Sequence, residues 1–205
     1  MNKIEYLGDC KNLFLDISSS CTGWVVAGMD SRTREITIYK AGVMWFGDDT
    51  PHGKKYNILS NFVLDTAYVA YHIQNVIAEG YMVNMNRVMG TLVIPEAQGS
   101  IKSACFETVP PLGFYNVYPQ TWRAALSIKK DTKFTSSKAW KEPTKKRVEE
   151  LLGQKLPPKI RSNVTGKDRP IPYDIFDALG VALAWYMKEP NSCVKINVDK
   201  NFLIS

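Results

Sequence analysis

Two carboxylates stand one helical turn apart at the start of an apolar segment, YDIFDALGVALAWY (173 to 186). At helical spacing this segment forms a face suited to a protein core, with Asp174 and Asp177 together on one side of the first turn. Acids in that position can stabilise a helix N-terminus by capping free amides and by opposing the macrodipole. Whether they also do chemistry depends on the acids elsewhere in the chain.

Two further acids occupy positions where a carboxylate is unusual. Asp16 lies in NLFLDI (12 to 17), an almost continuous apolar run that predicts a central strand. Glu79 lies at the end of QNVIAEG (74 to 80), a second short apolar strand. A buried carboxylate without a partner is costly. If the two strands are parallel neighbours, their ends open into one crevice and the acids can meet.

Four carboxylates at one place would repel one another and raise their own pKa values unless cations lay among them. Ligands that offer only oxygen suit Mg²⁺ or Mn²⁺ rather than Zn²⁺. Two such ions, about 3.5–4 Å apart, can hold the attacking and leaving oxygens of a phosphodiester. The chain has only two histidines, His52 and His72, which leaves little material for zinc sites or histidine acid–base chemistry.

The elements that must position these acids follow the order β-β-β-α-β-α-β-α, then a basic insertion, then a last helix. Segments 12–17, 22–29 and 35–40 are joined by turns too short for crossovers, which predicts an antiparallel meander. Thr50 and Pro51 predict the N-cap and first residue of a long helix. The apolar stripe of that helix consists of Tyr56, Leu59, Val63, Ala67, Ala70 and Ile73.

The other predicted elements are a strand at 74–80, a helix at about 95–108, a strand at 114–118, a helix opened by PQTWRAAL, a short helix at 143–152, a loop to residue 172 and the closing helix. The predicted fold class is therefore α/β, with a five-stranded mixed β-sheet flanked by α-helices. Three of its strands form the antiparallel meander, and the others are parallel to the first.

Length and composition predict one globular domain over residues 1–205, since the chain is 45% hydrophobic and 22% charged. No apolar run is long enough to span a bilayer, and the N-terminal residues lack the apolar segment of a signal peptide. We expect a cytoplasmic protein, in the host cytoplasm if it is encoded by a phage. The four cysteines form no C-x-x-C pair and are expected to be free thiols.

Positive charge is concentrated in one segment, a basic insertion at about 127–171. Residues 129–169 hold thirteen Lys and Arg against five Asp and Glu, a net charge of +8 in a chain whose total is +6. Such a segment can bind the phosphates of a nucleic acid. It can also be a solvated loop with no partner, and composition does not decide between the two.

Three of these motifs together resemble one family. LFLDISSSCTGWVV resembles the first strand and turn of the RuvC family of Holliday junction resolvases, VIAEGYMVNMN resembles its glutamate strand, and YDIFDALGVALAWY resembles its closing D-x-x-D-A helix. The resemblance extends from about residue 12 to 188. It implies a ribonuclease H-like fold, a homodimer, and a Mg²⁺-dependent crossover junction endodeoxyribonuclease, in which Mn²⁺ can substitute. By match to the motifs, the catalytic and metal-binding acids are Asp16, Glu79, Asp174 and Asp177.

The resemblance also assigns basic residues to DNA binding. VYPQTWR resembles a strand-to-helix segment in which a proline is followed four positions later by a lysine, and here that position is Arg123. An arginine keeps the charge and can bind a phosphate through two parallel hydrogen bonds. TKKRVEELL resembles the family's later basic helix, which places Lys145, Lys146 and Arg147 at the DNA.

A departure from the family pattern follows the strand glutamate, where the family has an aromatic wedge three positions on. This chain has Met82 there, preceded by Tyr81, and either side chain could separate paired bases at the branch point. The basic segment is also longer than in the bacterial enzymes, which suggests a phage-type member.

Other functions remain open from the sequence alone. The chain could be a ribonuclease H-like nuclease that acts on flaps, branched DNA or RNA–DNA hybrids, or a junction-binding protein that does not cut. A phosphotransferase of the actin and sugar-kinase superfamily would share the turn DISSSCTG, but the sequence lacks the internal repeat which that architecture needs. Each acid could also be structural by itself. The sequence assigns no functional role to the tryptophans.

Overall fold

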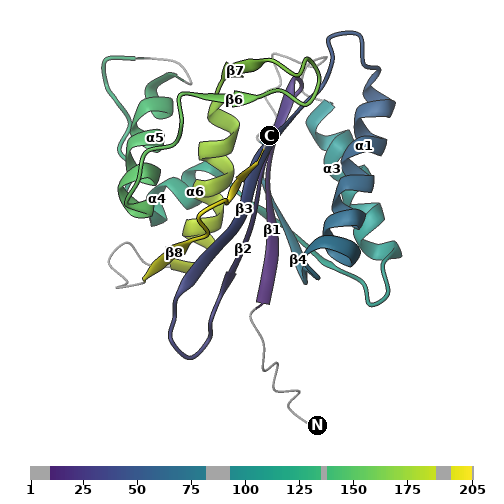
Figure 1. Ribbon diagram of the computed structural model, residues 1–205, viewed down its shortest axis with the longest axis horizontal. Coiled ribbons are helices and arrows are strands. Elements are labelled where there is room, and N and C mark those ends of the chain that lie inside the picture. Colours follow the sequence, from purple (N-terminus) through teal and green to yellow (C-terminus); the bar gives the residue numbers. More distant parts are fainter. Residues whose placement is uncertain (1–9, 82–92, 135–137, 188–194, 205) are drawn as a thin grey trace.

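The computed structural model describes residues 10–81, 93–134, 138–187 and 195–204. A mixed β-sheet lies at the centre, with helices on both faces (Figure 1). Helices α1 (His52–Asp65) and α3 (Val93–Glu107) cover one face. Helices α4 (Pro119–Ala125), α5 (Lys138–Leu152) and α6 (Tyr173–Met187) cover the other.

The predicted meander is present as β1 (Cys10–Ile17), β2 (Cys21–Met29) and β3 (Ile36–Trp45), which pair antiparallel in that order. Strand β4 (Asn75–Glu79) lies parallel to β1, and β5 (Gly113–Val117) lies parallel to β4. The α/β class and the mixed sheet are therefore as predicted. The C-terminal ends of β1 and β4 lie side by side, as predicted for neighbouring parallel strands.

The predicted number of strands in the sheet, five, was too low. In the described residues the sheet has seven, because β8 (Ile196–Val198) and β9 (Leu203–Ile204) both pair in parallel with β3. These strands have three and two residues, shorter than the runs of four to eight residues from which a strand can be read in a sequence.

Strand β1 is buried on both sides, which explains its nearly continuous apolar run. Leu13 and Leu15 pack toward α1 and α3, whereas Phe14 packs among residues of α6. Since side chains alternate along a strand, Asp16 faces the same side as Phe14 and therefore the start of α6.

The predicted start of the first long helix was wrong by one residue. Pro51 is the N-cap and His52 the first helical residue, and no side chain caps the free amides. The helix continues into a π-helical turn, η1 (Thr66–Ala70), in which the Tyr71 amide donates to the Thr66 carbonyl. This wider turn breaks the 3.6-residue spacing, so that Ala70 from the predicted stripe is exposed.

Helix α5 begins at Lys138, five residues before its predicted start, so Pro143 lies inside it. A proline has no N–H and leaves the carbonyl four residues earlier without its helical donor. Here that carbonyl belongs to Ala139, and it accepts a hydrogen bond from the Asp131 amide at 2.9 Å. The preceding loop thus satisfies the group that would otherwise oppose an internal proline.

The loop predicted before the closing helix contains a short antiparallel hairpin, β6 (Lys159–Arg161) and β7 (Asp168–Pro170). It lies across the end of the sheet at which α6 begins (Figure 1). Among the residues described, no helix has the length and apolar character that crossing a bilayer requires.

Helix α6 contacts the sheet most closely at Gly23 of β2. A Cβ at this position would lie against the backbone carbonyl of Asp174, well inside van der Waals contact. Gly23 is also the cross-strand partner of Asp16. The absence of a side chain at Gly23 therefore lets the first turn of α6 reach the strand that carries Asp16.

The substitution Gly23→Ala should destabilise the protein by about 1–3 kcal/mol, the usual cost of overpacking, because neither backbone can move freely. At about 2–4 °C per kcal/mol, thermal unfolding would record a clear fall in Tm. Gly99→Ala is the matched control, because a Cβ there meets nothing within 4 Å and alanine favours a helix. Equal Tm values for the two variants would contradict the close approach.

Candidate active site

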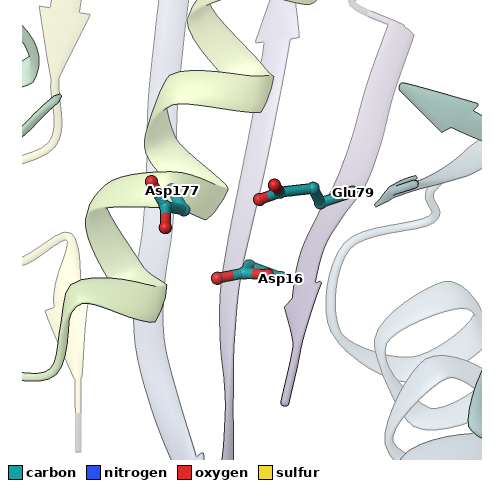
Figure 2. A group of neighbouring side chains, drawn as sticks. All are labelled: Asp16, Glu79 and Asp177. Atoms are coloured by element: carbon teal, nitrogen blue, oxygen red, sulfur yellow. The ribbon is translucent and has the colours of Figure 1, made fainter. Parts of the chain in front are cut away.

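Three carboxylates converge where β1, β4 and α6 meet. Asp16 lies near the end of β1, Glu79 ends β4, and Asp177 lies in α6, one turn after Asp174. One oxygen from each of the three lies within 4.8 Å of the others. Figure 2 shows the three side chains reaching from two strands and a helix toward a common space.

Asp174 is not a member of this group of three. Its charge still raises the pKa of Asp16, after larger contributions from burial, Glu79 and Asp177. It also lies beside Cys21, whose pKa rises to about 12 chiefly through burial and then through Asp174. The four acids predicted as one ligand set are thus arranged as three close carboxylates with a fourth acid nearby.

The mutual repulsion expected from the sequence is present. Burial, followed by the neighbouring carboxylates, raises the pKa of Asp16 well above its ordinary value. Burial and then Asp177 raise the pKa of Glu79 to about 8. Burial raises the pKa of Asp177 to about 6, against an opposing effect of Arg123. The site therefore favours protons or cations near neutral pH.

In the described part of the chain, Arg123 forms ion pairs with two of the three acids. Its Nη2 atom lies 3.8 Å from Glu79 Oε1 and 3.7 Å from Asp177 Oδ1. Its guanidinium carbon lies 4.7 Å from the ring centre of Trp122 and 5.3 Å from that of Trp140. Its Nε is buried and has no hydrogen-bond partner in the described part of the chain. Charge and two aromatic rings hold this arginine, with no short hydrogen bond to either acid.

A cavity of about 510 Å³ opens at the carboxylates. Asp16, Glu79 and Arg123 form part of its wall. The other lining residues are Ile17, Gly80, Tyr81, Ile94, Pro119, Gln120 and Trp140. Tyr81 thus lines the cavity at the acids, whereas Met82 is outside the residues that the structure describes.

The donor set fits a hard divalent cation. All three close ligands are carboxylates, which suits Mg²⁺ or Mn²⁺. Glu79 Oε2 is buried without a hydrogen-bond partner among the described residues, which is costly for a carboxylate unless a cation or proton satisfies it. Gln98 supports the end of β4, since its Nε2 donates to the Glu79 carbonyl at 2.8 Å.

The predicted basic residues of α5 differ in how free they are. Lys145 Nζ lies over the ring of Phe176 at 5.7 Å, next to α6. Lys146 is exposed and pairs at 4.0 Å with Glu150. Arg147 donates from Nε to the Leu126 carbonyl at 3.0 Å and also pairs with Glu150, so it supports the fold.

Nothing in the sequence alone selects Trp122, Trp140 or Lys141 as functional residues. Trp122 is fully buried and Trp140 lines the cavity, and both contact Arg123. Lys141, one turn before Lys145, lowers the pKa of Asp177. The one signal in the sequence is the group of an aromatic residue and lysines at the start of α5. Such a group is equally typical of a helix that packs on a core.

Comparison with known proteins identifies the fold. No protein-family model matches the chain, and no curated protein sequence does. Structures do match, including RuvC from T. thermophilus in complex with a Holliday junction substrate, with a TM-score of 0.62 and 17% identity over 86% of this chain and 93% of that one.

Two other Holliday junction resolvases match over similar lengths. The yeast mitochondrial enzyme Ydc2 has a TM-score of 0.55 and 11% identity over 86% of this chain and 77% of its own. The fowlpox virus resolvase has a TM-score of 0.52 and 10% identity over 87% and 98%. The chain therefore has the ribonuclease H-like fold of these resolvases, and the fold implied by the three sequence motifs is confirmed.

In the absence of divalent cations, the stability of the protein should fall as the pH rises from about 5 to 8. The pKa of Glu79 rises from 4.5 in the unfolded chain to about 8 in the folded one. Between these values the folded state binds more protons than the unfolded state, so each rise in pH favours unfolding. Tm measured in a chelator across this range tests the trend.

Glu79→Gln should flatten this pH profile and unfold at a higher temperature than the wild type at pH 8. The exposed Glu107→Gln is the control and should keep the wild-type profile. Added Mg²⁺ or Mn²⁺ should raise the wild-type Tm more at pH 8 than at pH 5, since a cation binds ionised carboxylates. A Glu79→Gln profile as steep as the wild type would contradict this electrostatic account.

Proposed function

We propose that this chain is a metal-dependent endonuclease that resolves four-way DNA junctions by paired, symmetric nicks. The observation that carries the proposal is the convergence of three carboxylates where strands β1 and β4 of a ribonuclease H-like sheet end beside α6, with an arginine between two of them. A shared fold hosts many functions, so this site, rather than the fold, supports the proposal.

The proposed ligands are Asp16, Glu79 and Asp177, with Asp174 as the additional acid beside them. Two Mg²⁺ ions, or Mn²⁺ in their place, supply charge stabilisation for the attacking and leaving oxygens of a phosphodiester when bound. Burial of the carboxylates keeps the site in low dielectric, where such stabilisation is stronger than in water.

Arg123 is proposed to bind the phosphate that is cut. Its Nη2 ion pairs to Glu79 and Asp177 are longer than hydrogen bonds, so the Nη2 donors are available to an incoming oxygen. Tyr81, in the cavity wall, is proposed together with Met82 to disturb base pairing at the branch point.

The proposal extends to the assembly. Residues 1–205 form one nuclease domain with a basic insertion at about 127–171, in which Lys145, Lys146 and Arg147 contact DNA phosphates. Two symmetric nicks require two active sites, so the proposed state is a homodimer. Its setting is DNA recombination and repair in the cytoplasm, that of the host if a phage encodes the protein.

Cleavage of a labelled four-way junction tests this function. We expect paired nicks in Mg²⁺ on the junction, and little cutting of linear duplex, flap or RNA–DNA hybrid. Asp16→Asn should reduce the cleavage rate by roughly 100-fold or more, while junction binding survives. A metal ligand should matter more than a residue that only supports a ligand, whose mutation costs about 10- to 100-fold. Preference for flaps or hybrids would point to a different ribonuclease H-like nuclease, and binding without cutting to a junction-binding protein.

The aromatic support of Arg123 gives a second prediction. Trp140→Leu should lower kcat by roughly 2- to 30-fold, the rate equivalent of losing a cation–π contact of about 0.5–2 kcal/mol. Trp140→Phe should retain most of the rate because it keeps an aromatic face. Trp185→Leu is the control, since Trp185 is also partly buried but pairs with Tyr115. Equal losses in all three variants would show that Trp140 does not act through Arg123.

A further inference from the structure

A group of basic side chains lies around β3 and the β6–β7 hairpin, away from the predicted bases of α5. We call it the basic track, and it consists of Lys40, Lys155, Lys159, Arg161 and Lys200. One end is a concave surface of about 450 Å³ that contains Lys40, Lys155 and Lys200 and no acid among its lining residues. Lys40 is oriented there by donating to the Asn201 carbonyl at 2.6 Å.

The other end is fixed by Asn163, in the turn of the β6–β7 hairpin. The Trp45 amide donates to Asn163 Oδ1 at 2.9 Å, and Asn163 Nδ2 donates to the Trp45 carbonyl at 3.3 Å. Trp45 pairs with Cys21 at the start of β2, two positions from the cross-strand partner of Asp16. Asn163 therefore lies near the same end of the strands as the acids.

Between these ends, the chain passes from Lys155, which shares a concave surface with Lys40, to Asn163, which is hydrogen-bonded to Trp45. Ile160 is buried in the core, so its neighbours Lys159 and Arg161 point the opposite way and are exposed. Trp45 lies five residue steps after Lys40 along β3, a span of roughly 17 Å at strand spacing. Lys159 and Arg161 therefore belong to a segment whose two ends are held at two points of β3.

The charges of the track are poorly compensated. None of the ion pairs found among the described residues involves Lys155, Lys159, Arg161 or Lys200, and Asp168, opposite Arg161 in the ladder, is the one acid of β6 and β7. On α5, by contrast, Glu150 pairs with both Lys146 and Arg147. The track therefore offers more free positive charge than the helix on which the sequence placed the DNA contacts.

We propose that the basic track binds the sugar–phosphate backbone of a DNA duplex that extends away from the acidic site. A duplex carries one charge per about 1.7 Å, hence about ten charges along roughly 17 Å, enough to neutralise every base of the track. The inference rests on the proposed function in one respect, because that function makes the duplex an arm of a junction.

The test compares two double variants that each remove one lysine and one arginine. Lys159→Gln with Arg161→Gln alters the track. Arg32→Gln with Lys102→Gln alters exposed residues elsewhere, at the turn between β2 and β3 and on α3. Binding to a linear DNA duplex is measured in a chelator between about 50 and 200 mM salt, since binding depends steeply on salt in this range.

The track variant should lose affinity, and its plot of log K against log salt should be shallower by about 1.8, which corresponds to two phosphate contacts. The control should keep the wild-type slope. If the track variant unfolds at a lower temperature than the control, Lys155→Gln replaces it, with an expected change in slope of about 0.9. A track variant that keeps the wild-type slope would overturn the inference, as would a change seen with duplex RNA alone.

Junction cleavage by the unaltered chain separates this result from the proposed function. A chain that binds duplex DNA through the track but cuts no junction would refute the function and support the inference. A chain that cuts junctions while the track variant binds like the control would refute the inference and leave the function in place.

Discussion

The close packing of α6 on β2 at Gly23 is the contact on which the acidic site depends. Asp16 is fixed by β1 and Glu79 by β4, and both strands belong to one sheet. Asp177 belongs to a helix and reaches them only because the first turn of α6 lies against a residue without a side chain. A second close contact, in which a Cβ at Gly180 would lie 2.6 Å from the Trp122 ring, sets α6 against α4 and hence against Arg123.

Placing three carboxylates at this contact stores electrostatic repulsion in the folded protein. Their raised pKa values express that repulsion, and one arginine offsets only part of it. The surrounding core supplies the compensating stability, since almost every residue of α6 after Asp177 is buried. Repulsion among the acids lowers the stability of the folded protein, and a bound cation would raise it again, because the cation would bind the folded state alone.

The sequence predicted the parts of this arrangement that periodicity controls. Asp16 and Glu79 could be found because a carboxylate in a short apolar strand is conspicuous, and parallel pairing then brings the strand ends together. The contact of Trp140 with Arg123 could not be predicted, because it depends on where α5 packs. The start of α5 depends in turn on the Asp131 amide, which donates a hydrogen bond to the Ala139 carbonyl. Strands β8 and β9 escaped prediction because they exist only through pairing with β3.

An acidic site that acts on a polyanion faces an electrostatic conflict under the proposed function. Three carboxylates repel a phosphate at short range, and Arg123 and Lys141 reduce that repulsion without removing it. Positive surfaces farther from the acids can hold DNA at several points while the reacting phosphate is still unfavourably placed. A divalent cation held by Asp16, Glu79 and Asp177 would reduce this local repulsion and so allow a phosphate to approach the acids. Under the proposed function, binding and cutting would therefore depend on different residues, and binding would not require the cation.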